Sequence, residues 1–316
     1  MKLNAVESEP PILQRFVHSL PVMQPADRLR ELMDLGIIEQ VVRPLKSGKE
    51  ASVFVVIADG EYCAAKVYKE AQHRSFRNRQ DYVEGRSVRN SRQQRAMNSG
   101  SKFGQKQNEE AWQNAEAAAM ARLHAAGVRI PRPRNNAEGV LLMDLVVDQN
   151  GDPAPQIATR QYSRNDALYA HDMVIHAVTG MLCAGLVHGD LSEFNILAAH
   201  DGPMIIDLPQ AVDATRNNNA KRLLLRDVAN VKRFFGRFAP ELFRSEYGEE
   251  MWLLYESSLL RPNIQLTGRF QTARKHVDAQ GLLKVIAEAK ADAAKQAEIK
   301  QARDEARRDK VQGIKR

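Results

Sequence analysis

The chain has 316 residues, long enough for one large domain or two medium ones. Its 43% hydrophobic and 27% charged residues are typical of a chain that folds around a buried core. The net charge of +7 arises in one stretch, because residues 73–106 hold nine Lys and Arg against two acids. The rest of the chain is neutral on balance, so its composition does not indicate a general nucleic-acid-binding fold.

Two classes of protein are disfavoured by the sequence. Cys63 and Cys183 are the only cysteines, lie far apart and fit no zinc-binding spacing, so we expect buried free thiols rather than a disulfide framework. Residues 7–11 are acidic and proline-rich where a signal peptide needs an apolar stretch. The most apolar long window, 167–187, contains Asp172 and two histidines and fails as a membrane span. The sequence therefore predicts a cytoplasmic protein without a membrane partner.

The N-terminal half is predicted to be rich in β-strands. Residues 1–25 carry four prolines and no clear period, which indicates a mobile arm. A short amphipathic helix is expected over 26–35. Asp59-Gly60 is a strong hairpin signal between two apolar runs. The expected strands cover residues 41–45, 52–58 and 62–68.

A basic insertion separates these strands from the next helix. Residues 70–106 have few large apolar side chains and many Arg, Gln, Asn and Ser, so we expect a flexible, partly helical segment. The Ala-rich stretch 109–125 predicts a helix whose Glu109 and Glu110 lie at its positive end. Prolines at 131 and 133 indicate an extended connection, and residues 140–147 a buried strand.

The second half is predicted to be mainly helical. Ser163 is expected to cap a helix that runs to Cys183. A strand is expected over 204–208 after the turn residues Asp201-Gly202. Further helical patterns cover residues 220–236, 240–260 and a charged tail.

The stretch His188-Gly189-Asp190-Leu191-Ser192-Glu193-Phe194-Asn195 places four residues between an Asp and an Asn. This is the spacing of a protein-kinase catalytic loop, in which the Asp orients the attacking hydroxyl and the Asn binds Mg²⁺. Twelve residues later, Asp207 ends an apolar run, where a second metal ligand belongs. The alternative, that these are only capping and turn residues, does not explain why all three occur in this order. We therefore predict phosphoryl transfer, with Asp190 catalytic and Asn195 and Asp207 as metal ligands.

Lys66 lies in an apolar strand, a position for which solvent exposure alone is a poor explanation. It matches the strand lysine that contacts the α- and β-phosphates of ATP. Its expected partner is an acid on the next helix, and Glu116 in the middle of 109–125 is the better choice. The insertion at 70–106 accounts for the long separation between the two residues.

The phosphate-binding loop differs from that of ordinary kinases, because there is no Gly-x-Gly-x-x-Gly. A single glycine in Ser47-Gly48-Lys49-Glu50 joins two predicted strands, and Val53 follows in the second of them. Ser47 and the backbone N–H groups can donate to phosphate oxygens, and Lys49 adds positive charge. The alternative is an ordinary hairpin turn.

The adenine site is predicted on the chain after the strand at 140–143. Met143 would be the gatekeeper, and backbone groups of Asp144 and Val146 would reach the base. A plain buried strand is the alternative.

These residues resemble the RIO kinases, an atypical protein-kinase family, and its first subgroup in particular. The resemblance spans about residues 37–250. It is carried by Ser47-Gly48-Lys49-Glu50-Ala51, Ala65-Lys66-Val67-Tyr68-Lys69, Phe76-Arg77, Tyr82-Val83-x-Gly85-Arg86, Trp112 with Glu116, the loop from Leu186 to Asn195, Ile205-Ile206-Asp207-x-x-Gln210-x-Val212 and Arg226-Asp227-x-x-Asn230-Val231. Leu208-Pro209 departs from the family's usual small residues after the metal-binding Asp.

The resemblance implies an α+β, bilobal protein-kinase-like fold without an activation segment or peptide-binding subdomains. Its expected parts are an arm at 1–25, a β-rich N-lobe at 26–147, a helical C-lobe at 148–265 and a charged helical or disordered tail at 266–316. It also implies ATP and Mg²⁺ as cofactors, with Mn²⁺ as a substitute. The implied activity is serine/threonine phosphorylation of a protein or of the chain itself, or ATPase turnover, with a link to ribosome maturation.

Two other functions stay open at this point. Aminoglycoside- or choline-type small-molecule kinases share the fold and a His-Gly-Asp loop, and a large acidic pocket formed by C-terminal helices would favour them. A nucleotide-switched assembly factor could instead bind RNA or a ribosomal partner through residues 73–106. The hypothesis of RNA binding is based on four arginines that recur every three residues, Arg86, Arg89, Arg92 and Arg95. The same segment also offers serines for autophosphorylation, namely Ser75, Ser87, Ser91, Ser99 and Ser101.

Overall fold

The computed structural model describes residues 27–48, 50–69 and 102–270, with side chains from Asn114 onward in the helix that begins at Lys102. The predictions for the arm at 1–25, for Lys49, for most of the insertion and for the tail beyond residue 270 lie outside the described residues.

Five antiparallel strands form the main sheet, in the order β1-β2-β3-β5-β4. The predicted hairpin is present between β2 and β3, where Asp59 and Gly60 have φ angles of 52° and 72°. Positive φ at both central residues is the conformation that suits the twist of a two-residue hairpin. The strands are β1 (Gln40–Ser47), β2 (Ala51–Ala58), β3 (Glu61–Tyr68), β4 (Pro133–Ala137) and β5 (Val140–Asp144).

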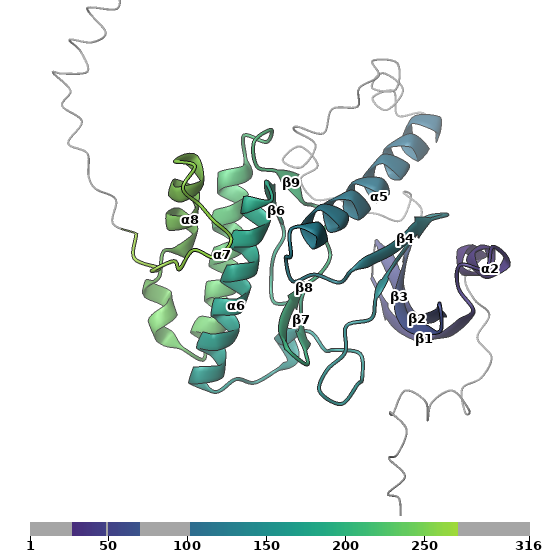
Figure 1. Ribbon diagram of the computed structural model, residues 1–316, viewed down its shortest axis with the longest axis horizontal. Coiled ribbons are helices and arrows are strands. Elements are labelled where there is room, and N and C mark those ends of the chain that lie inside the picture. The colour runs from purple at the N-terminus through teal and green to yellow at the C-terminus, as the bar shows by residue number, and fades with distance from the viewer. Residues whose placement is uncertain (1–26, 49, 70–101, 271–316) are drawn as a thin grey trace, which may run out of the picture. The chain divides into compact units, whose positions relative to one another are not determined.

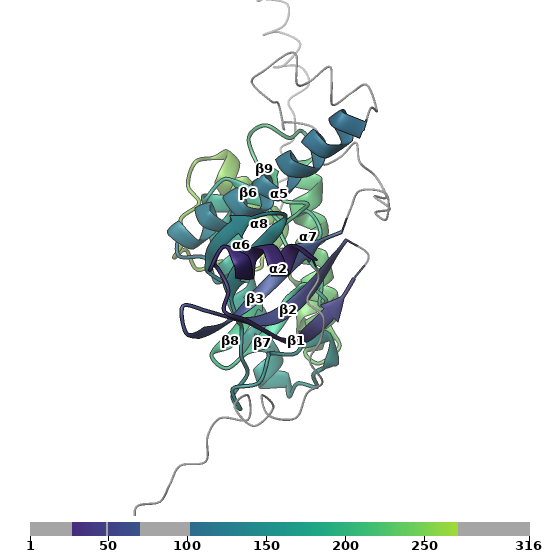
Figure 2. The same ribbon diagram turned by 90° about the vertical axis from the view of Figure 1, so that its right-hand side faces the viewer.

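The two faces of β3 have different partners, because successive side chains of a strand point to opposite sides. Cys63, Ala65 and Val67 belong to a cluster with Leu29 and Leu32 of helix α2 (Asp27–Asp34), which covers that face of the sheet (Figure 2). Ala64, Lys66 and Tyr68 have the opposite parity. Tyr68 belongs to the larger core cluster, together with apolar residues of helix α5 (Lys102–Ala125). The alternation in β3 therefore directs Lys66 away from α2 and toward the α5 side.

Helix α5 corrects one prediction. It begins at Lys102, seven residues before the predicted start at Glu109, so its first turn contains no acidic residue. Glu109 and Glu110 therefore lie too far into the helix to stabilise its N-terminus, since the dipole effect is confined to the first turn. The predicted C-terminal end at Ala125 is confirmed, with Gly127 in a left-handed conformation shortly after it.

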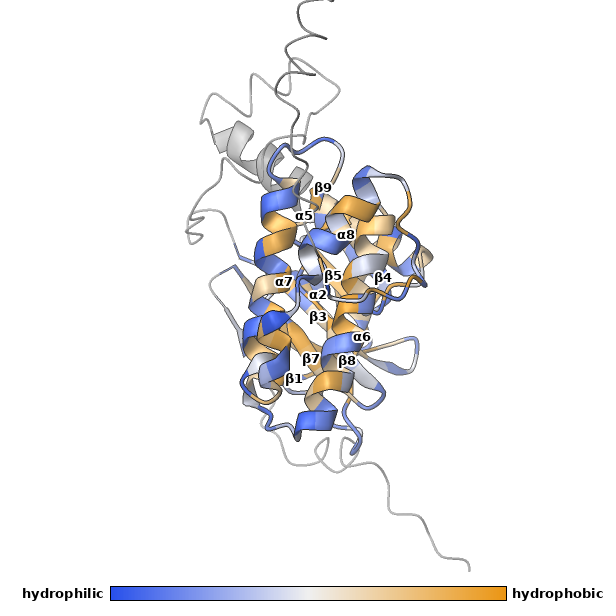
Figure 3. Ribbon diagram, turned by 90° about the vertical axis from the view of Figure 1, so that its left-hand side faces the viewer, coloured by the Kyte–Doolittle hydropathy of each residue, from blue (hydrophilic) through white to orange (hydrophobic). Residues whose placement is uncertain are grey.

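The remainder of the described chain is mainly helical. Helix α6 (Arg164–Cys183) starts at the predicted cap, where the Ser163 hydroxyl accepts the backbone N–H of Asp166 at 3.2 Å. Helix α7 (Ala220–Gly236) lies beside α6, and polar and apolar residues alternate along both helices (Figures 1 and 3). The other elements are η2 (Ile157–Thr159), β6 (Leu186–Val187), β7 (Ile196–Ala199), β8 (Gly202–Ile205), β9 (Val212–Asp213), η3 (Pro240–Arg244) and α8 (Tyr247–Glu256). A β-sheet region followed by helices is the α+β, protein-kinase-like arrangement that the sequence predicts.

Several further elements differ from prediction. The strand expected over 140–147 ends at Asp144, and the one expected over 204–208 is β8, which ends at Ile205. The helix expected over 240–260 is divided into η3 and α8 by the extended residue Ser245. The connection at 131–137 contains a strand, β4, at the edge of the sheet. Pro133 is compatible with that position, because an edge strand need not donate every backbone N–H.

Across residues 27–48, 50–69 and 102–270, no helix is both long and apolar enough to cross a membrane.

Candidate active site

Lys66 of β3 is held between two carboxylates that come from different parts of the chain. Its Nζ lies 2.7 Å from Oε1 and 3.0 Å from Oε2 of Glu116 on α5, and 2.6 Å from Oδ1 of Asp207. Lys66 and Glu116 are both buried. The structure thus brings together three residues that the sequence separates by up to 141 positions.

The charges at this cluster stabilise one another. Burial lowers the pKa of Lys66, but the negative charges of Glu116 and Asp207 outweigh that effect, so its pKa is raised and the ammonium stays charged. Burial raises the pKa of Asp207, yet the charge and hydrogen bond of Lys66 dominate and lower it overall. A lysine in this setting is a fixed positive charge and no proton donor near neutral pH.

Asp207 adopts an uncommon backbone conformation. Its φ is 67°, in the left-handed region that few non-glycine residues occupy, although Asp is among those that tolerate it. The next residue, Leu208, is buried in the core and donates its N–H to Glu116 Oε1 at 3.2 Å. The Leu208 side chain, which departs from the family pattern, therefore packs in the core. Its backbone N–H bonds the segment that contains Asp207 to helix α5.

A short hairpin brings Asn195 next to the Asp207 segment. Strand β7 begins directly after Asn195, and strand β8 ends two residues before Asp207. Ile196 of β7 pairs with Ile205 of β8, and the Ile206 N–H donates to the Asn195 carbonyl at 3.0 Å. The side-chain amide of Asn195 donates to the backbone carbonyl of Asp190 at 2.9 Å. Both predicted metal ligands therefore lie at the open end of the hairpin, one beside each strand.

The loop around Asp190 is shaped by its two preceding residues. Gly189 has a φ of 81°, which glycine adopts without strain. Buried His188 accepts the Asp190 N–H through Nδ1 at 3.2 Å, which assigns its Nε2–H as donor to the Ile206 carbonyl at 3.1 Å. Burial also lowers the pKa of His188, in agreement with a neutral ring. His188 therefore supports the loop, while Asp190 is left exposed.

Asp190 has the features of a group that can accept a proton. Its side chain is exposed, whereas its backbone is fixed by neighbouring residues. Although solvent reaches the side chain, the surrounding protein removes part of the water around its carboxyl, and this desolvation is the main cause that raises its pKa, with a smaller contribution from the charge of Asp207. A raised pKa makes a carboxylate a better proton acceptor.

Helix α7 fixes the backbone on both sides of Asp190. Asp227, which is 1% exposed, accepts the N–H of Gly189 at 2.7 Å and that of Leu191 at 3.0 Å. Arg226 donates to the Gly189 carbonyl, and Asn230 donates to the Leu191 carbonyl at 3.0 Å. We call these three residues of α7 the loop clamp. All four backbone polar groups of the residues that flank Asp190 are thereby bonded to one helix.

The predicted phosphate loop is a tight turn between β1 and β2. The Gly48 N–H donates to the Ala51 carbonyl at 2.8 Å, and the hydroxyls of Ser47 and Ser52 lie 3.1 Å apart. Lys69 Nζ, from the end of β3, donates to the Gly48 carbonyl at 2.6 Å and to the Ser47 hydroxyl at 3.2 Å.

Two further residues predicted for this loop lie nearby. The half-buried Glu50 accepts the Lys69 N–H through its carbonyl at 2.9 Å. Val53 pairs with Lys66 across β2 and β3, so the loop and Lys66 belong to adjacent strands.

The predicted adenine-site residues lie at the end of β5. Met143 pairs with Ala64 of β3. The Asp144 N–H donates to the Arg132 carbonyl at 3.0 Å, and its carboxylate lies 2.5 Å from Arg134. The Val146 carbonyl accepts the Ala154 N–H at 2.9 Å. These bonds fix the segment, and its role toward a base stays a prediction.

The donor set at the hairpin ends fits a magnesium ion. Mg²⁺ prefers oxygen ligands and is usually held by one or two protein groups together with substrate phosphates and water. Asp207 offers a carboxylate that stays ionised. Because the Asn195 amide nitrogen donates to Asp190, the amide oxygen is left as the acceptor that a cation needs.

Sequence reasoning did not find two features of this site. The first is Tyr68, whose hydroxyl donates to Glu116 Oε2 at 2.6 Å. The second is the loop clamp, which the sequence marked only through the family resemblance of its helix. The spacing Lys66-x-Tyr68 could have indicated the first, because it places both side chains on the same face of a strand.

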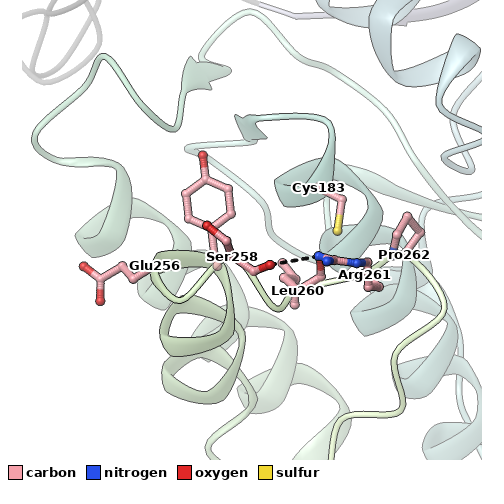
Figure 4. Close-up of a pocket in the computed structure, with 7 residues that line it drawn as sticks. Cys183, Glu256, Ser258, Leu260, Arg261 and Pro262 are labelled. Atoms are coloured by element: carbon pink, nitrogen blue, oxygen red, sulfur yellow. Dashed lines mark hydrogen bonds between the residues drawn. The ribbon is translucent and has the colours of Figure 1, made fainter.

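Two cavities in the helical region share no lining residue with this site, and Figure 4 shows the larger of the pair. It has a volume of about 630 Å³ and is lined by the end of α6 and by the segment after α8, where Arg261 donates to the carbonyls of Ser258 and Leu260. Its lining also includes Tyr255 and Glu256 at the end of α8, and Glu256, its one carboxylate, lies away from Arg261 in Figure 4. The second, of about 330 Å³, also has a single carboxylate, Asp172. Neither is the acidic pocket expected of a small-molecule kinase.

Comparison with known proteins agrees with this geometry. The RIO domain profile matches residues 52–247. The chain is 36% identical over 211 residues to the RIO-type serine/threonine-protein kinase Rio1 of Haloferax volcanii, covering 66% of this chain and 67% of that protein. It is 30% identical over 273 residues to the human serine/threonine-protein kinase RIO1, covering 82% of this chain.

A second archaeal relative, Rio1 of Methanocaldococcus jannaschii, is 33% identical over 194 residues, or 61% of this chain and 62% of that protein. The matched part spans only 46% of the human relative's length. The matched range contains Lys66, Glu116, Asp190, Asn195 and Asp207. The chain therefore belongs to the RIO kinase family, in its Rio1 subgroup.

Proposed function

We propose that this chain transfers the γ-phosphoryl group of ATP to a serine or threonine hydroxyl of a protein or of the chain itself. The observation that carries the proposal is the position of Lys66 between Glu116 and Asp207, with Asp190 on a loop that Asn195 joins to the same hairpin. Phosphoryl transfer depends mainly on positioning and charge neutralisation, and this arrangement supplies both. The names of the relatives, which are serine/threonine-protein kinases, point to the same reaction.

Each residue has a distinct role in this proposal. Lys66 would bind the α- and β-phosphates, and Glu116 would orient it. Asn195 and Asp207 would hold Mg²⁺, which when bound neutralises charge on the phosphates. Asp190 would accept the proton of the attacking hydroxyl, while the loop clamp keeps its backbone in place. The Ser47 hydroxyl, which accepts Lys69, would donate to a phosphate oxygen, whereas the Gly48 N–H is already bonded to the Ala51 carbonyl.

Several finer points belong to the proposal. Acceptance of Mn²⁺ in place of Mg²⁺ follows from the oxygen-rich ligands. A specificity for serine and threonine over tyrosine follows the names of the relatives. A cytoplasmic location and a ribosomal partner rest on the sequence and the family, and the basic residues 73–106 are the candidate RNA-binding segment.

The small-molecule alternative is weakened by the two cavities, each of which carries a single carboxylate. An RNA-binding switch uses the same nucleotide site but releases phosphate to water. The two reactions therefore differ in where the phosphate goes.

The reaction is tested by incubating the purified chain with γ-labelled ATP and Mg²⁺. Label on the chain, label on an added serine-containing protein, label on choline or an aminoglycoside, and free phosphate are measured in parallel. We expect protein-bound label, and we expect Asp207→Asn to abolish it. Label on the small molecules would identify the alternative kinase class. Free phosphate alone would identify an ATPase switch, and no turnover of any kind would refute the proposal.

A further inference from the structure

Tyr68 contacts both partners of the Lys66–Glu116 ion pair. Its side chain is 2% exposed, and its hydroxyl donates to Glu116 Oε2 at 2.6 Å. Lys66 Nζ lies 5.4 Å from the centre of the Tyr68 ring, within the range of a cation–π contact. One side chain therefore contacts the anion through its hydroxyl and the cation through its ring.

The geometry follows from the strand. Lys66 and Tyr68 are two positions apart in β3, so both side chains leave the same face of the sheet. Tyr68 is itself fixed by its backbone, whose N–H donates to the Gly139 carbonyl at 3.1 Å and whose carbonyl accepts Arg28 at 3.0 Å. The hydroxyl therefore projects from a rigid position.

Glu116 accepts hydrogen bonds from three directions. Oε1 accepts Lys66 Nζ at 2.7 Å and the Leu208 N–H at 3.2 Å. Oε2 accepts the Tyr68 hydroxyl at 2.6 Å and Lys66 Nζ at 3.0 Å. A carboxylate has about four acceptor positions, so these four bonds satisfy it. Oε2 has two donors, Lys66 and Tyr68, so Tyr68 is the one that holds this oxygen independently of Lys66.

Lys66 is also attracted by Asp207, which lies 2.6 Å away on the other side. If Glu116 could rotate, the ammonium would have one fixed carboxylate and one mobile one. A hydrogen bond from a rigid neighbour prevents that rotation, since moving the carboxylate would leave buried polar groups without partners.

We propose that Tyr68 is a positioning residue, which holds the Glu116 carboxylate so that Lys66 is presented to the phosphates of ATP. This inference rests on the proposed function. It predicts that the Tyr68 hydroxyl acts on nucleotide binding only through Glu116.

A double-mutant cycle tests this dependence. Dissociation constants for Mg·ATP are measured by calorimetry for the full chain, Tyr68→Phe, Glu116→Ala and the double variant. Removal of a hydrogen bond to a charged, buried group is expected to weaken Mg·ATP binding about tenfold in Tyr68→Phe. In the Glu116→Ala background, the same change is expected to alter affinity less than twofold.

The matched control is Tyr62→Phe. Tyr62 lies on the same strand with the same parity but near the hairpin end, where it pairs with Ile57. The affinity of the Tyr62→Phe variant for Mg·ATP is expected to stay within twofold of that of the unchanged chain. Thermal unfolding of every variant confirms that folded proteins are compared.

A chain with 3-fluorotyrosine at position 68 covers the case in which Tyr68→Phe does not fold. It keeps the ring and the hydroxyl, so core packing is preserved, while ring fluorination alters the strength of the hydrogen bond that the hydroxyl donates. Its Mg·ATP affinity is expected to differ from that of the unchanged chain when Glu116 is present, and to stay within twofold of the matched chain when Glu116→Ala removes the acceptor.

Two outcomes overturn the role of Tyr68 alone. One is an equal loss of affinity with and without Glu116, which would show that Tyr68 acts through core packing. The other is an affinity that neither Tyr68→Phe nor fluorination changes. An unchanged chain that does not bind Mg·ATP is a different result, because it removes the proposed function as well.

Discussion

At the scale of single residues, buried polar atoms in this protein differ in how well they are satisfied. Glu116 accepts four hydrogen bonds at 2.6–3.2 Å from three donors, Lys66, Tyr68 and Leu208. His171 of α6 is also buried, but its Nε2 has no hydrogen-bond partner in the part of the chain that the structure describes. Its ring packs against Phe235 and Tyr247 at centroid distances of 6.0 and 5.3 Å. The hydrogen-bonding capacity of Glu116 is thus filled, whereas the imidazole of His171 is buried with one nitrogen unsatisfied.

His171 is predicted to make the protein sensitive to acid. Burial, followed by the charge of Lys232, lowers the pKa of His171 to about 4 from its usual 6.5. Between these values the unfolded chain binds the proton that the folded chain rejects, so stability falls as the pH drops from 6.5 to 4. We expect His171→Leu to remove this component, which amounts to as much as about 1.4 kcal/mol per pH unit. Chemical unfolding at pH 7, 6 and 5 measures it.

The control for this prediction is the exposed His176 on the same helix. His176→Leu should leave the pH dependence of stability unchanged. If His171→Leu and the unchanged chain lost stability in parallel as the pH is lowered, the assignment to His171 would be wrong.

At the scale of elements, helix α7 supports the loop around Asp190. The loop clamp bonds the N–H and carbonyl groups of Gly189 and Leu191, which leaves Asp190 little freedom to move with its backbone. The hairpin of β7 and β8 similarly fixes the spacing between Asn195 and the Asp207 segment. Rigid elements therefore hold both the proposed proton acceptor, Asp190, and the proposed metal ligands, Asn195 and Asp207.

Loss of one clamp contact should affect turnover more than binding. Asn230→Ala removes the donor to the Leu191 carbonyl, and Asp190 would then be less well placed in the transition state. We expect kcat to fall about tenfold, equivalent to about 1.4 kcal/mol, with KM for ATP within twofold. Lys221→Ala, on the exposed part of the same helix, should leave both constants unchanged. A rise in KM at constant kcat would contradict a positioning role.

The sequence predicted the elements that carry strong local signals. Asp59-Gly60 and the Ser163 cap have geometric requirements that few residues meet, and both occur in the structure. Boundaries without such signals were wrong. The start of α5 lies in a polar stretch without a hydrophobic period, and β4 contains a proline and two asparagines that disfavour a strand. Only the place of β4 at the edge of the sheet explains why these residues form a strand.

The site was predictable where the chemistry requires a fixed order of residue types. Lys66, the Asp190 loop and Asp207 follow that order, and Glu116 could be chosen because it lies in mid-helix. The contacts of the loop clamp depend on tertiary packing, and so does the choice of Glu116 as the partner of Tyr68. The spacing Lys66-x-Tyr68 indicates only that Lys66 and Tyr68 share a strand face.

At the scale of the whole molecule, the bonds between Lys66 and Asp207 and between Leu208 and Glu116 connect the β-sheet region to the helical region. The nucleotide would bind to residues from both. A ligand that binds only the folded chain stabilises it in proportion to its affinity.

Mg·ATP should therefore raise the melting temperature. At about 100 times its dissociation constant the gain is about 2.7 kcal/mol, or roughly 5 to 10 °C for a domain of this size. Asp207→Asn should lose more than half of this shift because it weakens the metal site. The control is Asp201→Asn, at the tip of the same hairpin, where Asp201 pairs with Arg129 at 2.8 Å. An equal shift in both variants would exclude Asp207 as a ligand.

The most direct test of phosphoryl transfer at this site separates binding from turnover in Asp190→Asn. The variant keeps the shape of the side chain but cannot accept the proton of the attacking hydroxyl. We predict that it binds Mg·ATP within about threefold of the unchanged chain, while transfer of the γ-phosphoryl group falls about 100-fold or more. Unchanged transfer in a variant that still binds the nucleotide would show that the reaction does not take place at Asp190.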